Sequence, residues 1–223
     1  FKNAEWVGAS ERTPKTFSIL RGHFYLDEII NVSLNILGLG FFKCYINGQC
    51  INPDTFLPLS SDYEGGCDPV DEIISAHRIY VPQFDITPFV KIGDNVIAVH
   101  FGGGWYTHRC RVFGLPKATY CISAETSDGV KNYCSDAYCR IGKSFVEDYD
   151  FTEFETHNYT DFSSCFDTEF DDSGWEYATP TEPLETEYCS TGTDRNRPIK
   201  LVPLYQQRKQ TGTDTCRQIH QTI

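Results

Sequence analysis

Methionine is absent from all 223 residues of this sequence, which begins with phenylalanine. We therefore expect the sequence to be part of a longer chain. No apolar run approaches the roughly 20 residues that cross a bilayer, and residues 1–5 lack the apolar core of a signal peptide. The net charge of −12 repels nucleic-acid phosphates and anionic lipids. These absences predict a soluble protein with neither a nucleic-acid nor a membrane partner.

Signatures of metal and nucleotide chemistry are also missing. None of the ten cysteines forms a Cys-x-x-Cys pair, so no zinc site is expected. The sequence contains no Gly-x-Ser-x-Gly, P-loop or dinucleotide-binding motif, and Gly102-Gly103-Gly104 lacks the Lys-Ser/Thr that follows in a P-loop. We interpret this glycine run as a turn after a strand.

The cysteines leave the redox state open. Cys44 and Cys121 fall in strand-like alternation, where a free thiol behaves as a small buried apolar side chain. This position favours reduced core cysteines and the cytoplasm. A disulfide framework and secretion remain the alternative.

Aromatic residues make up 14% of the chain, and apolar residues alternate with polar ones along several segments, both typical of strands. From Ile30 to Ile36 the alternation places every second residue, Ile30 included, on one apolar face. A second alternation, from Phe42 to Ile51, contains Asn47-Gly48, a dipeptide that supplies the positive φ angles of a type I′ turn. This segment is predicted to be a tight hairpin.

The same alternation predicts strands at 78–81, 84–90 and 96–101, and a hairpin of 118–126 and 130–141 around Asp128-Gly129. Residues 52–78 are rich in Pro, Asp, Gly and Ser and are expected to form a long loop, with a short helix from Val70 to His77 at most. The predicted fold is all-β: an antiparallel β-sandwich of the jelly-roll, galactose-binding-domain-like kind with long loops. Residues 1–180 are expected to form this domain. Residues 181–223 are expected to form a linker or closing strand that leads to a further module, followed by a polar tail.

Three groups of motifs follow one another along the chain. The first is Trp6-Val7-Gly8 with Tyr45-Ile46-Asn47-Gly48, and the second is Phe84-Asp85-Ile86-Thr87 with Gly93–Val99 and Gly104-Trp105-Tyr106. The third is Phe170–Trp175. Together they resemble the N-terminal β-sandwich domain of bacterial α-L-rhamnosidases, over roughly residues 4 to 180. They are also similar to sugar-binding sandwich domains of β-galactosidase-like glycoside hydrolases. Where the rhamnosidase family commonly has Pro-Gly-Trp-Thr-x-Tyr, this chain reads Pro58–Tyr63 and lacks the tryptophan.

The resemblance implies a non-catalytic accessory domain of a glycoside hydrolase that acts on rhamnose-containing glycans. Its partner is then a downstream (α/α)-barrel, which in that family carries the catalytic acids. Glycoside hydrolysis needs two carboxyl groups that flank the scissile bond, whereas the acidic run from Glu147 to Glu155 is typical of a solvated surface. No catalytic residue and no metal ligand are therefore predicted in this chain.

The alternative is an autonomous carbohydrate-binding module. An aromatic ring can stack on a sugar while Asn and Asp side chains bind its hydroxyls, so the candidate sugar-binding residues are Asn52, Asp54, Asp62, Trp105 and Tyr106. No cofactor is expected, although calcium held by the aspartates of the 52–78 loop is possible. The competing interpretation makes Trp105 and Trp175 anchors of the core. A self-contained enzyme is the least favoured reading.

Overall fold

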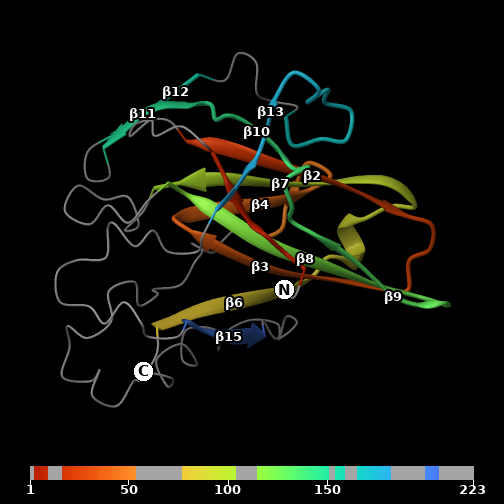
Figure 1. The fold of residues 1–223 in the computed structure, drawn as a ribbon. Helices are drawn as coiled ribbons and strands as arrows, with labels where there is room; N and C mark the ends of the chain where they lie inside the picture. The colour runs from red at the N-terminus through yellow and green to blue at the C-terminus, as the bar shows by residue number, and fades with distance from the viewer. Residues whose placement is uncertain are drawn as a thin grey trace, which may run out of the picture.

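The computed structural model describes residues 3–9, 17–53, 77–103, 115–150, 154–158, 165–181 and 199–205. These residues form two large β-sheets and a small one (Figure 1). They also contain a single 3₁₀ turn, η2 (Thr87–Phe89), in the chain that connects the first large sheet to the second. In this part of the chain no helix is both long and apolar enough to cross a membrane. The predicted all-β, antiparallel sandwich is confirmed.

The first large sheet has seven strands. In spatial order they are β14 (Thr179–Thr181), β1 (Trp6–Gly8), β8 (Lys117–Thr126), β3 (Asn31–Leu39), β6 (His77–Asp85) and β15 (Ile199–Tyr205), and β9 (Gly129–Cys134) pairs with β8. All these pairs are antiparallel except β15 with β6, which is parallel. Figure 1 shows β15 beside β6 at the border of this sheet.

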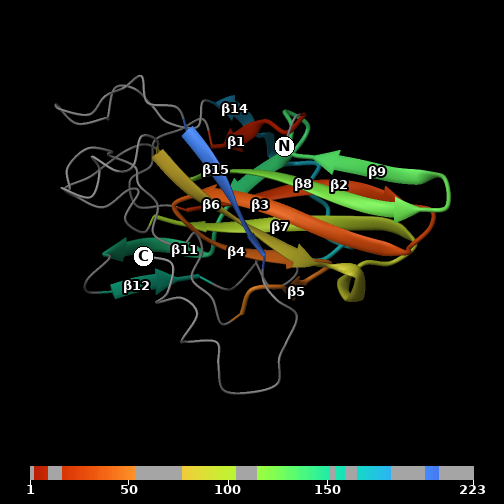
Figure 2. The same cartoon turned by 90° about the horizontal axis from the view of Figure 1, so that it is seen from below.

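The second large sheet has six strands and faces the first. In spatial order they are β13 (Glu176–Tyr177), β10 (Arg140–Lys143), β2 (Ser18–Leu26), β7 (Gly93–Gly102), β4 (Phe41–Ile46) and β5 (Gln49–Cys50). A separate hairpin joins β11 (Val146–Asp150) to β12 (Phe154–His157). Figure 2 shows this hairpin at one end of the sandwich and the tip of the β8–β9 hairpin at the other.

The core lies between the two large sheets and is built by alternation. Val32, Leu34 and Ile36 of β3 are fully buried and belong to one apolar cluster with Cys44 and Ile46 of β4. Each such aliphatic side chain contributes roughly 1.5–3 kcal/mol when it leaves water. The predicted β3 and β4 faces are therefore the ones that the fold buries, apart from Ile30, which precedes β3 and is 56% exposed.

The predicted tight hairpin is confirmed. Asn47 and Gly48 have φ angles of 49° and 81° and separate β4 from β5, as a type I′ turn requires. The side-chain oxygen of Asn47 accepts a hydrogen bond from the Val96 amide (2.9 Å), and its nitrogen donates to Asn95 Oδ1 (2.8 Å). The turn is thereby tied to the start of β7.

The second predicted hairpin is only partly right. Its first strand and its Asp128-Gly129 turn are present, but the predicted strand 130–141 ends at Cys134. The chain turns between Asp136 and Cys139, whose amide donates to the Asp136 carbonyl (3.2 Å), and then enters the other sheet as β10. Apolar alternation continues across this turn, so it could not reveal the change of sheet.

Beyond Thr181, which ends β14, the structure describes residues 199–205, which form β15. β15 pairs with β6 over seven positions, from Ile199 opposite His77 to Tyr205 opposite Gln83. The boundary near residue 180 and the assignment of residues 181–223 to a linker or closing strand that leads to a further module both remain predictions. Of the short helix predicted from Val70 to His77, all but His77 lies outside the described residues, and His77 begins β6.

Candidate functional site

Among the five predicted sugar-binding residues, the structure describes Asn52. The other four, Asp54, Asp62, Trp105 and Tyr106, lie outside the described residues. Asn52 follows β5 and is 2% exposed. Its Oδ1 accepts a hydrogen bond from the Cys44 amide (2.8 Å), and its Nδ2 donates to the Phe42 carbonyl (3.4 Å). The side chain of Asn52 therefore fixes the chain to β4 where the 52–78 segment begins.

The ends of the two candidate sugar-binding segments lie at the same part of β4. Lys43 Nζ donates to the carbonyls of Asn52 (2.8 Å) and Pro53 (2.5 Å) on one side of the strand. On the other side, Gly102, which precedes the Trp105 segment, pairs with Phe41. We refer to this part of β4, with Pro53 bound to Lys43 and Gly102 paired with Phe41, as the loop end of the sandwich.

His100 lies at the loop end, on the outer face of the six-stranded sheet, opposite Lys43 in the register. Its Nε2 is 2.5 Å from Ser144 Oγ, and its ring is 4.5 Å from that of Phe145. Burial, with a smaller contribution from the nearby His157, lowers the pKa of His100 to about 4. His100 is therefore neutral at neutral pH and acts as a packed hydrogen-bonding group.

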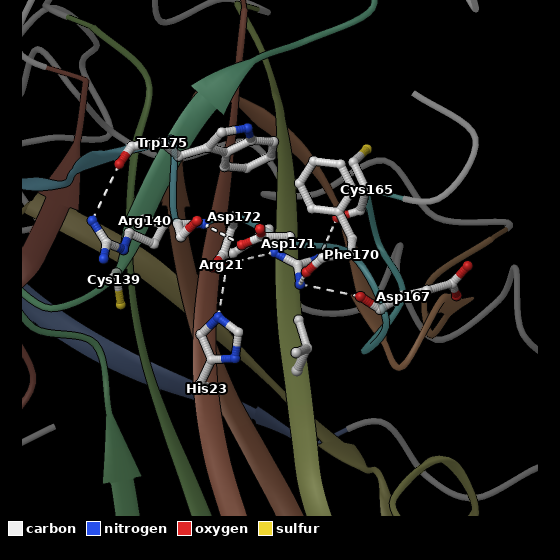
Figure 3. Close-up of polar contacts among 12 residues, drawn as sticks. Arg21, His23, Cys139, Arg140, Cys165, Asp167, Phe170, Asp171, Asp172 and Trp175 are labelled. Atoms are coloured by element: carbon white, nitrogen blue, oxygen red, sulfur yellow. Dashed lines mark hydrogen bonds and ion pairs between the residues drawn. The ribbon is translucent and has the colours of Figure 1, made fainter. Parts of the chain in front are cut away.

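A buried arginine lies further along the same face. Arg21 of β2 is fully buried, and its Nε donates to Asp172 Oδ2 (2.8 Å), as Figure 3 shows. The two terminal nitrogens donate to the carbonyls of Cys165, Asp167 (3.1 Å) and Phe170 (3.4 Å). All of these acceptors belong to the segment 165–178, so this one side chain holds several turns of irregular chain against the sheet.

Asp172 has a second partner in His23, the next outward-facing residue of β2. The Nε2 atom of His23 lies 2.7 Å from the oxygen that Arg21 contacts and donates to it. Burial alone would raise the pKa of Asp172, but the hydrogen bonds from Arg21 and His23, together with their charges, hold it below 3.8. The carboxylate is therefore ionised at neutral pH and satisfied by two donors.

Aromatic side chains of the segment 165–178 complete the cover over the six-stranded sheet. Phe166 stacks on Tyr45 of β4 with ring centroids 4.0 Å apart. Phe170 lies 5.3 Å from Trp175, and the Trp175 ring lies so close to Gly142 of β10 that a Cβ there would come within 2.3 Å of it. Trp175 is thus half-buried against the outer face of the six-stranded sheet, whereas the competing interpretation expected it in the core.

The geometry of this cluster suits anchoring rather than bond cleavage. The carboxylate of Asp172 is committed to Arg21 and His23, whereas glycoside hydrolysis needs two carboxyl groups free to face a substrate. The described residues also contain no group of three or more His, Cys, Asp or Glu side chains placed to hold a metal ion. The four aspartates of the 52–78 loop suggested for calcium, Asp54, Asp62, Asp68 and Asp71, lie outside the described residues.

His100 was expected to be packed or solvent-facing rather than catalytic, and it is packed beside Ser144. Arg21, His23 and Ser144 were not among the residues predicted from the sequence. Arg21 alternates with Leu20 and Phe24 and shares the polar face of β2 with His23, so the sequence pattern predicts an exposed arginine. Its burial depends on Asp172, which lies 151 residues further along the chain and which no local pattern could identify.

Comparison with known proteins gives a consistent picture. A family model described as the alpha-L-rhamnosidase N-terminal domain matches residues 27–202. An alpha-L-rhamnosidase of Formosa agariphila is 23% identical over 176 residues, which cover 70% of this chain and 16% of the relative. One from Alteromonas sp. is 29% identical over 116 residues, covering 48% of this chain and 11% of the relative. The chain therefore corresponds to less than a fifth of the length of these curated relatives.

The fold is shared with a solved structure. The alpha-L-rhamnosidase from Dictyoglumus thermophilum superposes with a TM-score of 0.69 at 22% sequence identity. The match covers 81% of this chain and 21% of that one. At this identity the likeness supports a shared architecture and leaves the function to be argued from the chain itself.

Proposed function

Because the chain belongs to the alpha-L-rhamnosidase N-terminal domain family, we propose that it is the non-catalytic accessory domain of a bacterial-type glycoside hydrolase acting on rhamnose-containing glycans. The catalytic acids of the parent protein then lie in a downstream domain. The role of this chain is to provide a rigid body against which that domain docks.

The cover that the segment 165–178 forms over part of the outer face of the six-stranded sheet is the observation that supports this proposal. Arg21 and Asp172 fix the segment 165–178 over that face, and Phe166 and Trp175 pack beneath it. The polar groups of the cluster are used to hold the chain to itself. Where the segment 165–178 covers it, this face supports neighbouring structure better than it accommodates a substrate.

The test compares two purified proteins with an aryl α-L-rhamnoside as substrate. We expect the parent protein to release the aryl group and the 223-residue chain to release none. Deleting the chain from the parent should lower the melting temperature of the remainder or its yield of folded protein. Turnover by the chain alone would overturn the assignment of catalysis to another domain.

A second candidate function, sugar binding, is favoured by the geometry of the loop end. Pro53 and Gly102 flank the same part of β4, so the segments that carry Asp54 and Asp62 and those that carry Trp105 and Tyr106 start close together. In this proposal Asn52 positions the first segment, the aromatic rings stack on the sugar, and calcium joins the aspartates to its hydroxyls.

Isothermal titration of the chain with L-rhamnose, with and without calcium, tests the second function. Binding predicts heat that Trp105→Ala abolishes. The matched control Tyr138→Ala removes an aromatic ring that is 80% exposed on the β9–β10 turn and should leave the heat unchanged. Absence of heat with and without calcium would leave the supporting role alone.

A further inference from the structure

Two cysteines face each other across the β8–β9 hairpin. Cys121 of β8 and Cys134 of β9 are direct partners in the antiparallel register, and their sulfur atoms lie 3.0 Å apart. Both thiols are free. Because a covalent S–S bond is about 2.05 Å long, the sulfurs need to approach by only about 1 Å to be joined.

The hydrogen-bond pattern of the hairpin explains why the side chains meet. The Ser135 amide donates to the Tyr120 carbonyl (3.0 Å), so Tyr120 and Ser135 occupy a hydrogen-bonded position of the ladder. The neighbouring pair, Cys121 and Cys134, therefore falls in a non-hydrogen-bonded position, where facing side chains of antiparallel strands come closest. The backbone thus brings the thiols together without strain in the strands.

The two thiols differ in access. Cys121 is 7% exposed, while Cys134 is partly exposed on a strand that otherwise faces solvent. The weak contact from Cys121 Sγ to Asn132 Oδ1, at 3.9 Å, offers no competing strong partner for this sulfur. A small oxidant can therefore reach Cys134 first and leave Cys121 positioned to react second.

We infer that Cys121 and Cys134 form an oxidation site that closes to a cross-strand disulfide in the presence of a small-molecule disulfide. This inference does not depend on the proposed function. The thiolate of Cys134 attacks one sulfur of the oxidant, forms a mixed disulfide and releases one thiol. The deprotonated Cys121 sulfur then attacks Cys134 Sγ and releases the second thiol. Two thiols are oxidised, one disulfide is reduced to two thiols, and the two protons pass to the leaving groups.

The disulfide has a clear structural role. Among the described strands, β9 pairs with β8 alone, and most of its residues are exposed. Cys134 is the last residue of β9, at the end opposite the Asp128-Gly129 turn. A bond there fixes the open end of the hairpin, beside Ser135, whose hydroxyl donates to the Glu5 carbonyl (2.7 Å) and ties the hairpin to the N-terminal segment.

Burial also predicts how the reaction depends on pH. Burial, with the hydrogen bond to Cys121, raises the pKa of Cys134 to about 12. Because the thiolate is the reacting species, we expect closure to be slow at neutral pH and to accelerate as the pH rises towards 9.

Peptide mapping of the full chain tests the inference. The chain is incubated with mixtures of oxidised and reduced glutathione. It is then unfolded in the presence of iodoacetamide, which alkylates the remaining free thiols, and digested with trypsin. Cleavage after Lys117, Lys131 and Arg140 places Cys121 in peptide 118–131 and Cys134 in peptide 132–140. We expect a linked pair of these peptides, 2 Da lighter than the sum of the two free peptides, since two hydrogens are lost. Fragment ions should assign the bond to Cys134 rather than Cys139.

Variants separate this site from the remaining cysteines. Cys121→Ser and Cys134→Ser should each abolish the linked peptide. Cys139→Ser should retain it, because Cys139 lies in the same tryptic peptide but contacts the buried Tyr120 hydroxyl (3.3 Å). The linked form should melt about 5–10 °C higher than the reduced form, as expected for a bond that closes a loop of this length.

The contrary results are equally definite. The inference is overturned if folded wild-type protein shows both cysteines alkylated at every glutathione ratio, or each carrying its own glutathione. A bond from Cys121 to Cys139 overturns it as well. An unchanged melting temperature of the linked form would remove the stabilising role of the bond.

Discussion

At the scale of single residues, Arg21 is the most constrained side chain of the described structure. Its guanidinium is fully buried, and its nitrogens reach one carboxylate and three backbone carbonyls. The ring of Phe170 lies 5.2 Å from its Cζ atom. A buried charge is tolerated only when it is paired and hydrogen-bonded, so removing one partner costs more than the pair contributes.

This asymmetry gives a prediction for Asp172→Ala. The substitution leaves the buried Arg21 charge without its carboxylate, and we expect it to lower the free energy of unfolding by about 3 kcal/mol. The matched control is Asp171→Ala, because Asp171 is the adjacent residue but is exposed and accepts local hydrogen bonds from Ser173, including one from its amide (2.9 Å). Urea unfolding at pH 7 should show a lower midpoint for the first variant and a nearly unchanged one for the second. Equal midpoints would show that Arg21 finds sufficient partners in the carbonyls.

At the scale of elements, the segment 165–178 packs closely against β10, where Gly142 has no side chain to occupy the space. The Trp175 ring occupies the space over Gly142 that a side chain would otherwise fill. The Arg140 side chain, on the same strand, donates to the Trp175 carbonyl (3.1 Å) and covers the Tyr177 ring at 3.8 Å. Glycine at position 142 is therefore required by proximity rather than by backbone conformation.

Gly142→Ala tests this packing. Its methyl group would meet the Trp175 ring at 2.3 Å, so we expect the segment to shift and the free energy of unfolding to fall by about 1–3 kcal/mol. Gly174→Ala is the matched control, since no atom lies within 4 Å of the position that its methyl group would take. Tryptophan fluorescence followed during urea unfolding reports both the midpoint and the environment of the ring. A Gly142→Ala midpoint equal to that of Gly174→Ala would contradict close packing at this position.

The elements also show what the sequence could and could not predict. The β4–β5 hairpin was predictable because alternation and the Asn47-Gly48 turn are both local signals. The break between Cys134 and Arg140 was not, because the next strand keeps the apolar pattern while it moves to the other sheet. Ile30 continued the pattern of β3 but lies before the strand and is exposed.

The candidate site was less predictable for a related reason. Asn52 was selected as a sugar ligand because of its residue type, whereas the structure shows its amide bound to the β4 backbone. The Arg21–Asp172 pair joins strands and segments far apart in the chain, and one sequence carries no information on such long-range partners. The motif Phe170–Trp175 was recognised from its resemblance, but its role as a cover became clear only from the contacts.

At the scale of the whole molecule, the response to acid follows from groups that the fold holds in one charge state. The chain carries a net charge of −12 at pH 7, so mild acid reduces repulsion among its carboxylates. Two groups oppose this stabilisation by mild acid. Asp172 is held ionised by Arg21 and His23, and His100 is held neutral by burial.

The two groups affect stability in different pH windows. The pKa of Asp172 is lowered in the folded state, so its contribution is present above about 3.8 and is lost as the pH falls through the folded value. The pKa of His100 is also lowered, from 6.5 to about 4, but here the favoured form is the neutral one. Between pH 4 and pH 6.5, His100 binds a proton in the unfolded chain but not in the folded chain. Stability therefore falls as the pH falls from 6.5 to 4.

We accordingly predict that His100→Gln flattens the stability curve in mildly acidic solution. The difference between the two pKa values of His100 corresponds to about 3 kcal/mol, so the stability advantage of the wild type over the variant should shrink by about 2–3 kcal/mol between pH 7 and pH 4.5. Urea unfolding at a series of pH values measures this difference. Asp172→Ala provides the contrast, because the loss of its lowered pKa predicts that its difference from the wild type narrows as the pH falls below about 3.8. Parallel curves of unfolding free energy against pH for the wild type and His100→Gln would contradict this prediction. They would mean that His100 accepts a proton as readily in the folded state as in the unfolded one. Its environment beside Ser144 and Phe145 would then be more open to water than the packing indicates.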